Sequence, residues 1–221
     1  MKVLIVGANG KVGTILSGKL WAAHDFSPVA LIRNHMQQTK FTAMGVPSVV
    51  GDLEHGVEMF LPGLDAVVFT AGSGARTGPD KTIDVDQNAA IRLIDDCSSC
   101  AVSRFIMVSA IGADPKSESD RIRHYLRAKG VADEHLVHSG LDFSILAPGS
   151  LLDEPGRDRV QAAENLGVRG SIPREDVANC IVECLRNRLT IGRKIEVIAG
   201  DLAVSEAIST LVGGTPHPPI P

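Results

Sequence analysis

The chain has 221 residues, of which 44% are hydrophobic and 22% charged, which is a globular composition with enough length for one substantial core. A formal charge of −4 at pH 7 and a pI near 6.0 give no global positive field, which argues against nucleic-acid binding. No apolar run approaches the roughly 20 residues that cross a bilayer, and the N-terminus has no signal-peptide cleavage pattern. We therefore expect a soluble, cytoplasmic protein that binds neither nucleic acid nor membrane.

Short β-branched runs alternate with longer segments of helical periodicity, which is the pattern of repeated βα units around a parallel sheet. The expected strands are 2–6, 28–32, 47–51, 65–69, 103–109, 141–147 and 194–199. The expected helices begin near Lys11, Met36, Glu54, Asp80, Glu118, Arg174 and Val204. This order predicts an α/β protein with a three-layer Rossmann fold, a single domain whose doubly wound parallel sheet has about seven strands.

Two segments depart from this alternation. Residues 149–173 follow the sixth expected strand and mix acidic and basic side chains, and we interpret them as a short substrate lid that orders on binding. The tail 213–221 is rich in proline, which is typical of extended or disordered chain. The expected NAD(P)-binding domain therefore spans residues 1–212, and its ligands should lie at the carboxyl ends of the strands.

The first expected strand runs directly into the turn Gly7-Ala8-Asn9-Gly10-Lys11-Val12-Gly13, which precedes an amphipathic segment. Its glycines are expected to allow a tight turn, a close backbone approach to a pyrophosphate and close packing of the helix on the strand. Free amides at the start of that helix would attract the phosphates. The turn therefore predicts dinucleotide binding, and the alternative is a turn with only a structural role.

The residue after the second strand indicates which dinucleotide binds. An acidic side chain at this place accepts hydrogen bonds from the ribose hydroxyls of NAD, whereas this chain has Arg33 followed by Asn34. A guanidinium suits a 2′-phosphate, so NADPH is favoured and NAD remains possible. The alternative is a solvated surface arginine.

Loops after the later strands supply the remaining expected cofactor contacts. Asp52 would accept a hydrogen bond from the adenine amino group, cap a helix before Glu54, or do both. The other expected cofactor residues in these loops and beyond are Leu53, Thr70, Ala71, Gly72, Lys129, Pro148 and Gly149.

Tyr125 and Lys129 are four residues apart on an expected helix, which places both side chains on one helical face. A nearby ammonium stabilises a phenolate and would bring the tyrosine pKa, ordinarily about 10, toward neutrality. The pair therefore predicts acid–base catalysis. The alternatives are a pair that binds nucleotide without turnover and an ordinary helix face.

These motifs resemble the short-chain dehydrogenase/reductase superfamily, in particular its atypical or extended branch. The likeness covers about residues 1–200 and includes the glycine turn, the segments 51–53, 104–109, 125–129 and 139–149, and Arg174-Glu-Asp-Val-Ala178. The chain is similar to compact NAD(P)H-binding members that are often labelled as NAD-dependent epimerase/dehydratase or nucleoside-diphosphate-sugar epimerase. It departs from many relatives at Ala147, where they carry an arginine before Pro-Gly, so any role of that arginine is absent here.

The resemblance implies an NADPH-dependent oxidoreductase that reduces a small carbonyl or quinone compound by hydride transfer. Tyr125 would donate the proton, Lys129 would hold the nicotinamide ribose, and Ser109 would orient the carbonyl. The alternatives are an epimerase or dehydratase acting on a sugar-like substrate, and a non-catalytic NAD(P)H sensor that binds a protein partner. The short lid favours a small substrate, and we expect a monomer or homodimer.

The cysteines and histidines are not expected to bind metal. Cys97 and Cys100 have the spacing of a zinc or redox half-site, with Cys180 and Cys184 as its conceivable complement. Both pairs lie on expected helices, where packing of small apolar side chains explains them. The four cysteines are too few for a disulfide framework in a chain of this length, so we expect reduced thiols.

Overall fold

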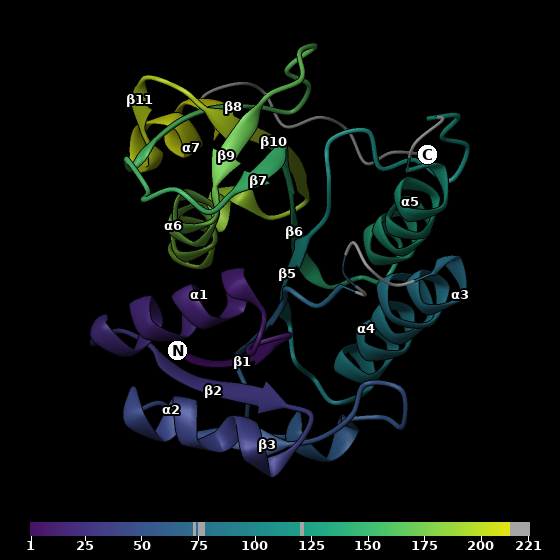
Figure 1. Ribbon diagram of the computed structural model, residues 1–221, viewed down its shortest axis with the longest axis vertical. Coiled ribbons are helices and arrows are strands. Elements are labelled where there is room, and N and C mark those ends of the chain that lie inside the picture. Colours follow the sequence, from purple (N-terminus) through teal and green to yellow (C-terminus); the bar gives the residue numbers. More distant parts are fainter. Residues whose placement is uncertain (73, 75–77, 120–121, 213–221) are drawn as a thin grey trace.

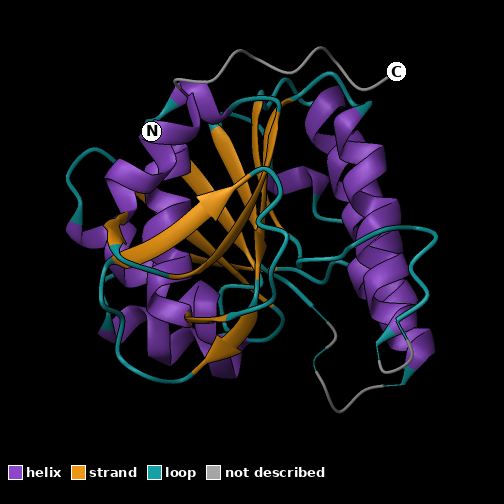
Figure 2. Cartoon of the chain, turned by 90° about the horizontal axis from the view of Figure 1, so that it is seen from above, coloured by secondary structure: helices purple, strands orange, loops and turns teal. Residues whose placement is uncertain are grey.

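The computed structural model describes residues 1–72, 74, 78–119 and 122–212. Within these residues, a nine-stranded sheet has the order β11-β8-β10-β6-β5-β4-β1-β2-β3, with helices on both faces (Figures 1 and 2). Its strands are β1 (Lys2–Val6), β2 (Ser27–Ile32), β3 (Ser48–Val50), β4 (Ala66–Phe69), β5 (Arg104–Val108), β6 (Asp142–Pro148), β8 (Arg159–Ala163), β10 (Arg193–Ala199) and β11 (Leu202–Ala203). The predicted three-layer Rossmann fold is confirmed.

The seven strands from β10 to β3 are all parallel, in agreement with the seven expected from the sequence. The sheet is two strands wider than predicted because β8 pairs antiparallel with β10, and β11 antiparallel with β8. The expected lid segment 149–173 therefore contains β8, together with β7 (Ser150–Leu152) and β9 (Ser171–Pro173), which form a separate parallel pair. Much of this segment is regular structure.

The helical segments connect these strands. They are α1 (Lys11–Ala22), η1 (His35–Gln37), α2 (Gln38–Ala43), η2 (Glu58–Phe60), α3 (Pro79–Thr82), η3 (Ile83–Ala89), α4 (Ala90–Ser99), α5 (Arg123–Val137), α6 (Arg174–Arg186), η4 (Arg188–Thr190) and α7 (Val204–Val212). Helices α1, α6 and α7 cover one face of the sheet, and α4 and α5 cover the other (Figure 1).

Each face of the sheet has its own hydrophobic core. Val3 and Ile5 of β1 pack into the core beneath α1 and α6, whereas Leu4 and Val6 pack into the core beneath α4 and α5. This alternation follows from the two-residue period of a strand, and burial on both sides explains why β1 has an unbroken apolar sequence.

Two helix predictions were wrong. No α-helix follows Glu54, because the Asp52 carboxylate accepts a hydrogen bond from the Glu54 amide at 3.0 Å and Gly56 has a φ of +91°, which favours turns. Helix α5 begins at Arg123 rather than near Glu118, because the preceding loop folds back and the Asp114 amide donates to the Leu126 carbonyl at 3.2 Å.

Among the described residues, no helix has the length and apolar character needed to cross a membrane. The proline-rich tail, residues 213–221, lies outside the described residues.

Candidate cofactor and active site

The turn between β1 and α1 requires glycine at its first and last positions. Gly7 has a φ of +83°, and a Cβ built on it would lie 2.5 Å from the backbone nitrogen of Ala71 in the loop after β4. A Cβ on Gly13 would lie 2.4 Å from the Gly7 carbonyl oxygen. The Gly10 amide donates to that carbonyl at 2.9 Å, which closes the turn. The backbone thus packs against its neighbours in the way a dinucleotide-binding turn requires.

A cavity of about 340 Å³ opens at the carboxyl ends of the first strands. The residues predicted for the cofactor that line it are Gly7, Asn9, Gly10, Arg33, Asp52, Leu53, Thr70, Ala71 and Gly72. Gly51, from the segment 51–53 that the sequence also indicated, lines it as well. The lining residues that the sequence did not single out are Leu31, Gln37, Glu54, Lys81 and Val85. A single cavity therefore gathers residues from four separate strand–helix loops.

Several predicted cofactor residues do not line this cavity. Ala8 and Val12 are buried in the core beneath α1. Asn34 is an exposed residue before η1. Pro148 and Gly149 contribute to loop packing, because the Pro148 carbonyl accepts from the Ile111 amide at 3.1 Å and the Gly149 amide donates to Val197 at 2.9 Å.

Two cations lie beside the glycine turn without a carboxylate partner among the described residues. Arg33 is exposed at the cavity edge, and its backbone amide donates to the Gln37 side chain at 3.0 Å. The Lys40 ammonium donates to Thr14 at 2.6 Å and to Asn9 at 3.3 Å. Sequence reasoning missed Lys40 because it lies seven positions after Arg33, in α2, beyond the short helix η1.

Lys11, in contrast, is paired. Its ammonium lies 2.5 Å from the Asp153 carboxylate, which also lies 2.6 Å from the Arg174 guanidinium. This contact joins the segment after β7 to the start of α1, next to the glycine turn.

Across the cavity, Lys81 of α3 and Glu54 form an ion pair at 2.5 Å. The backbone carbonyl of Glu54 accepts a further hydrogen bond from Arg92 at 2.8 Å. These contacts hold the loop after β3 against α3 and α4, so the wall opposite Arg33 is built from two elements distant in sequence.

Lys129 of α5 lies directly behind this cavity. Its ammonium is 3.1 Å from the Asp86 carboxylate, and it donates to the carbonyls of Val108 at 3.2 Å and Ala71 at 3.4 Å. Ala71 is itself a cavity wall. Burial lowers the pKa of Lys129, but Tyr125 and Asp86 outweigh it and the pKa is raised.

Tyr125 lies on the same face of α5, with its ring centroid 6.0 Å from the Lys129 ammonium. Burial raises the pKa of Tyr125, and this effect outweighs the lowering by Lys129. The expectation of a phenol pKa shifted toward neutrality is therefore wrong, because the sequence could not show the burial of the ring. At neutral pH the phenol keeps its proton.

Asp86 is the functional candidate that sequence reasoning missed. It lies within η3, a π-helix, and π-helices are rare and occur frequently at functional sites. Its side chain is fully buried, and a Cβ on Gly72 would lie 3.1 Å from Asp86 Oδ1. An acidic residue at a buried position of an expected helix was the available signal, because such a carboxylate needs a partner.

Ser109 is placed differently from the expectation. It follows β5, is only 3% exposed, and its hydroxyl donates to the Asp133 carboxylate at 2.6 Å. No contact within the described residues joins it to Tyr125 or Lys129. Direct contact with substrate stays a prediction for this residue.

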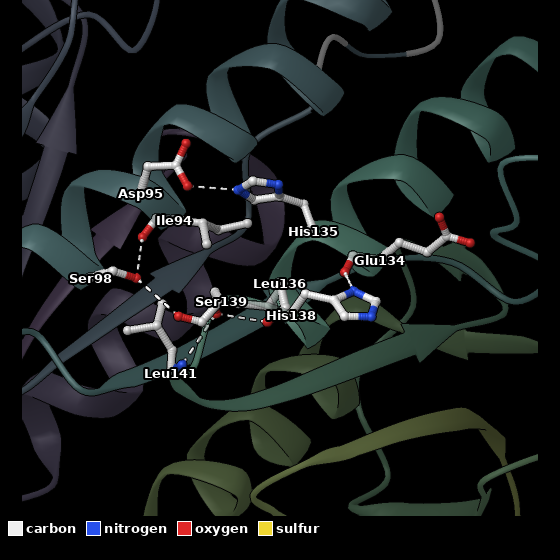
Figure 3. A network of polar contacts seen from close by, with 9 residues as sticks. All are labelled: Ile94, Asp95, Ser98, Glu134, His135, Leu136, His138, Ser139 and Leu141. Atoms are coloured by element: carbon white, nitrogen blue, oxygen red, sulfur yellow. Dashed lines mark hydrogen bonds and ion pairs between the residues drawn. The ribbon is translucent and has the colours of Figure 1, made fainter. Parts of the chain in front are cut away.

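Two histidines at the carboxyl end of α5, one in the helix and one directly after it, take part in surface contacts. His135 Nε2 lies 2.7 Å from Asp95 of α4, and His138 Nδ1 lies 2.7 Å from the Glu134 carbonyl (Figure 3). In the described part of the chain, no group of three or more His, Cys, Asp or Glu side chains is arranged to hold a metal.

The cysteine side chains are mainly core residues. Cys97, Cys180 and Cys184 are buried and their thiols are free, and Cys100 is half-buried. Burial raises the pKa of Cys97 and that of Cys184 to about 12. These thiols therefore have the inert character of structural cysteines.

The site fits a nicotinamide dinucleotide. The glycine turn leaves its backbone open to the cavity, Arg33 lies at the cavity edge, and Lys129 stands behind the wall formed by Ala71 and Gly72. An elongated cavity at the switch point of a Rossmann sheet is where such cofactors bind.

Comparison with known proteins gives the family of the chain. The chain matches a family of NAD(P)H-binding proteins over residues 7–188. It is 38% identical to the uncharacterized sugar epimerase YhfK of Bacillus subtilis over 215 residues, which are 96% of this chain and 100% of that protein.

Two solved structures are also similar. A Bacillus halodurans protein named for NAD-dependent epimerase/dehydratase activity superposes with a TM-score of 0.90 at 40% identity, over 96% of this chain and 100% of that one. The anaerobillin reductase ChuY of Escherichia coli O157:H7 superposes with a TM-score of 0.76 at 29% identity, over 91% and 98% of the two chains. The chain belongs to this family of NAD(P)H-binding proteins, and its fold is the Rossmann fold.

Proposed function

We propose that the protein is an NADPH-dependent reductase of a small carbonyl or quinone compound, with Tyr125 as the proton donor. The observation that carries this proposal is the contact of Lys129 with the Ala71 carbonyl, which lines the dinucleotide cavity. Since Tyr125 lies one turn before Lys129 on the same face of α5, the phenol is brought close to that cavity.

The chain's own residues have separable parts in this reaction. The turn from Gly7 to Gly13 would bind the pyrophosphate through backbone amides, and Arg33 would bind the 2′-phosphate of NADPH. The nicotinamide, when bound, supplies a hydride to the carbonyl carbon.

Tyr125 would hold a proton at its phenol oxygen and release it to the substrate oxygen. The charge of Lys129, fixed by Asp86, would stabilise the phenolate that remains.

The segment after β7 supports a substrate of limited size. Asp153 of this segment forms an ion pair with Lys11 beside the glycine turn. Strand β8 of the same segment pairs with β10 and belongs to the central sheet. The stretches between β7 and β8 and between β8 and β9 are then available as the lid that we propose for residues 149–173.

A second candidate is an epimerase or dehydratase that acts on a sugar-like substrate. The names of the relatives from Bacillus subtilis and Bacillus halodurans favour it. This reading requires NAD that is retained through the catalytic cycle, so tightly bound NAD in the purified protein would support it.

The test measures NADPH oxidation by the wild type and by Tyr125→Phe over a panel of small aldehydes, ketones and quinones. Calorimetry first establishes that both proteins bind NADPH with the same affinity. The proposal requires turnover by the wild type and its collapse in the variant. Equal rates in both proteins would exclude Tyr125 as proton donor, and no turnover with intact binding would favour the non-catalytic NAD(P)H sensor.

A further inference from the structure

Helix α5 carries three polar side chains on the face that packs toward the sheet. Tyr125, Lys129 and Asp133 follow one another at four-residue intervals, which aligns them along one side of a helix. Lys129 and Asp133 are 3% and 4% exposed. The proposed reaction uses the first two and leaves the buried carboxylate without a role.

Asp133 is held by residues from two other elements. Its Oδ2 accepts a hydrogen bond from the Ser109 hydroxyl at 2.6 Å and from the Lys194 ammonium at 2.9 Å. Lys194, at the start of β10, also donates to the Ala113 carbonyl at 3.0 Å. The carboxylate therefore joins α5 to the loop after β5 and to β10.

Burying a carboxylate costs free energy of desolvation, and an apolar side chain would fill the same space without that cost. The second oxygen of Asp133, Oδ1, is buried and has no hydrogen-bond partner among the described residues. Burial raises the pKa of Asp133, and Lys194 and Ser109 oppose that shift. Ser109 and Lys194 thus favour the ionised form of Asp133 although burial disfavours it, which indicates that the charge of this carboxylate has a role.

The charge of Asp133 acts on the proposed catalytic pair. Lys129 pairs with Asp86 of η3 at 3.1 Å, and both Asp86 and Asp133 of its own helix raise its pKa. Tyr125 faces the positive charge of Lys129 and the negative charges of Asp86 and Asp133. Within the described residues, these are the charged groups that shift the proton affinity of Tyr125.

We propose that Asp133 is a positioning residue for Tyr125: its carboxylate, held by Ser109 and Lys194, sets through its charge how tightly the phenol keeps its proton. The inference rests on the proposed function only where it assumes that Tyr125 gives this proton to a substrate. The interpretation also gives Ser109 and Lys194 a common part, which is to keep this carboxylate in place and ionised.

The size of the effect follows from the helix geometry. Eight residues of α-helix separate the two groups by about 12 Å along the axis. Coulomb's law with an effective dielectric constant between about 20 and 80 then gives a shift of roughly 0.3 to 1 pH unit.

The experiment is direct because Tyr125 is the only tyrosine of the chain. Its ionisation is followed by tyrosinate absorbance, or by NMR of a carbon-13-labelled ring, in the full-length protein without substrate. In Asp133→Asn we expect the Tyr125 pKa to fall by roughly 0.3 to 1 unit. The asparagine oxygen still accepts from Ser109 and Lys194, so the local contacts are retained.

The matched control is Glu134→Gln, which removes the same charge at the next residue of α5, on its exposed side. It should leave the Tyr125 pKa unchanged. Asp133→Leu is the second variant should Asp133→Asn fail to fold, because an apolar side chain of similar volume often replaces a buried charge without loss of stability. Lys194 is 35% exposed and stays in contact with solvent, and the Tyr125 pKa should again fall.

An unchanged Tyr125 pKa in a folded Asp133→Asn protein, or an equal shift in Glu134→Gln, would overturn the proposal. A Tyr125 pKa that does not fall in a folded Asp133→Leu protein would do the same. These outcomes are distinct from failure of the proposed function. That function is tested by the turnover of Tyr125→Phe, and its failure would leave the titration of Tyr125 in the wild type unaffected.

Discussion

Lys129 of α5 and Asp86 of the π-helix η3 form an ion pair at 3.1 Å, with the two side chains 3% and 0% exposed. It joins two segments that lie 43 positions apart in the sequence and fixes the cation behind the wall of the dinucleotide cavity. Breaking a buried ion pair leaves one charge uncompensated, so both the stability of the fold and the geometry of the site depend on this contact.

Asp86→Asn should destabilise the protein by about 3 kcal/mol, because the Lys129 ammonium stays buried with less negative charge to balance it. Urea unfolding measures the change in the free energy of unfolding. Asp84→Asn is the control, since Asp84 is exposed two residues earlier in the same π-helix, and it should alter stability by less than about 0.5 kcal/mol. Equal losses in the two variants would argue against the ion pair as the cause.

Stability should also fall at high pH through Lys129. Its pKa in the folded protein lies above the ordinary value of 10.5, so above that pH the folded state binds more protons than the unfolded state. The stabilisation is therefore complete below pH 10.5 and is lost as the pH rises through the folded-state pKa. Urea unfolding between pH 8 and pH 12 should show a steeper decline for the wild type than for Lys129→Met, and parallel curves would contradict this.

Two substitutions in the glycine turn should separate an effect on folding from an effect on cofactor binding. Gly7→Ala combines a φ of +83° with a Cβ 2.5 Å from backbone, and we expect a loss of about 2 kcal/mol or more in thermal unfolding. Gly10→Ala has its nearest contact at 3.1 Å, so it should fold normally. The added methyl group would still obstruct a pyrophosphate, and calorimetry should show weaker NADPH binding. Equal loss of stability in both variants would count against this assignment.

At Gly130 of α5, helix propensity and packing predict opposite effects of an alanine substitution on stability. Alanine in place of a helical glycine is favoured by about 1 kcal/mol, but a Cβ at Gly130 would lie 2.3 Å from the backbone carbon of Asp114. Because backbone cannot yield cheaply, we expect Gly130→Ala to destabilise the protein despite the better propensity. Gly18→Ala in α1 is the control, since its Cβ meets only the end of Met44 at 3.3 Å, and it should be neutral or stabilising in thermal unfolding.

Arg33 should determine the choice of nucleotide. Arg33→Gln would remove the charged hydrogen bond that we propose to the 2′-phosphate, so NADPH affinity should fall roughly tenfold or more while NADH affinity is unchanged. Lys40→Gln should have a smaller effect of the same kind, because Lys40 is bonded to Asn9 and Thr14. Calorimetry with both nucleotides measures the ratio, and a parallel loss for NADH would show that Arg33 acts on folding or on a shared part of the cofactor.

The local part of this structure was predictable from the sequence. The strand-turn-helix unit from Lys2 to Ala22 follows from an apolar run, a glycine turn and an amphipathic segment that are contiguous in the chain. The seven parallel strands follow from apolar runs of strand length. Helical periodicity alone places Tyr125 and Lys129 on one face. In each case the determining interactions lie within a few residues of one another.

Contacts between distant segments decided most of the rest. The edge pairing of β8 with β10 widened the sheet beyond the seven predicted strands, and the hydrogen bond from the Asp114 amide to the Leu126 carbonyl accompanies the later start of α5. The helix expected after Glu54 failed for a local reason, the hydrogen bond from the Glu54 amide to the Asp52 carboxylate. No local pattern shows that Ser109 would bond to Asp133, which lies 24 positions later in the chain.

Burial had the largest effect on the chemistry of the site. It raises the pKa of Tyr125 where the sequence predicted a fall, and it gives Asp86 its importance as the partner of Lys129. The sequence by itself determined which residues could take part, because spacing and residue type are local. Only the tertiary structure decided their charges and partners, because desolvation and ion pairing depend on which distant segments fold against them.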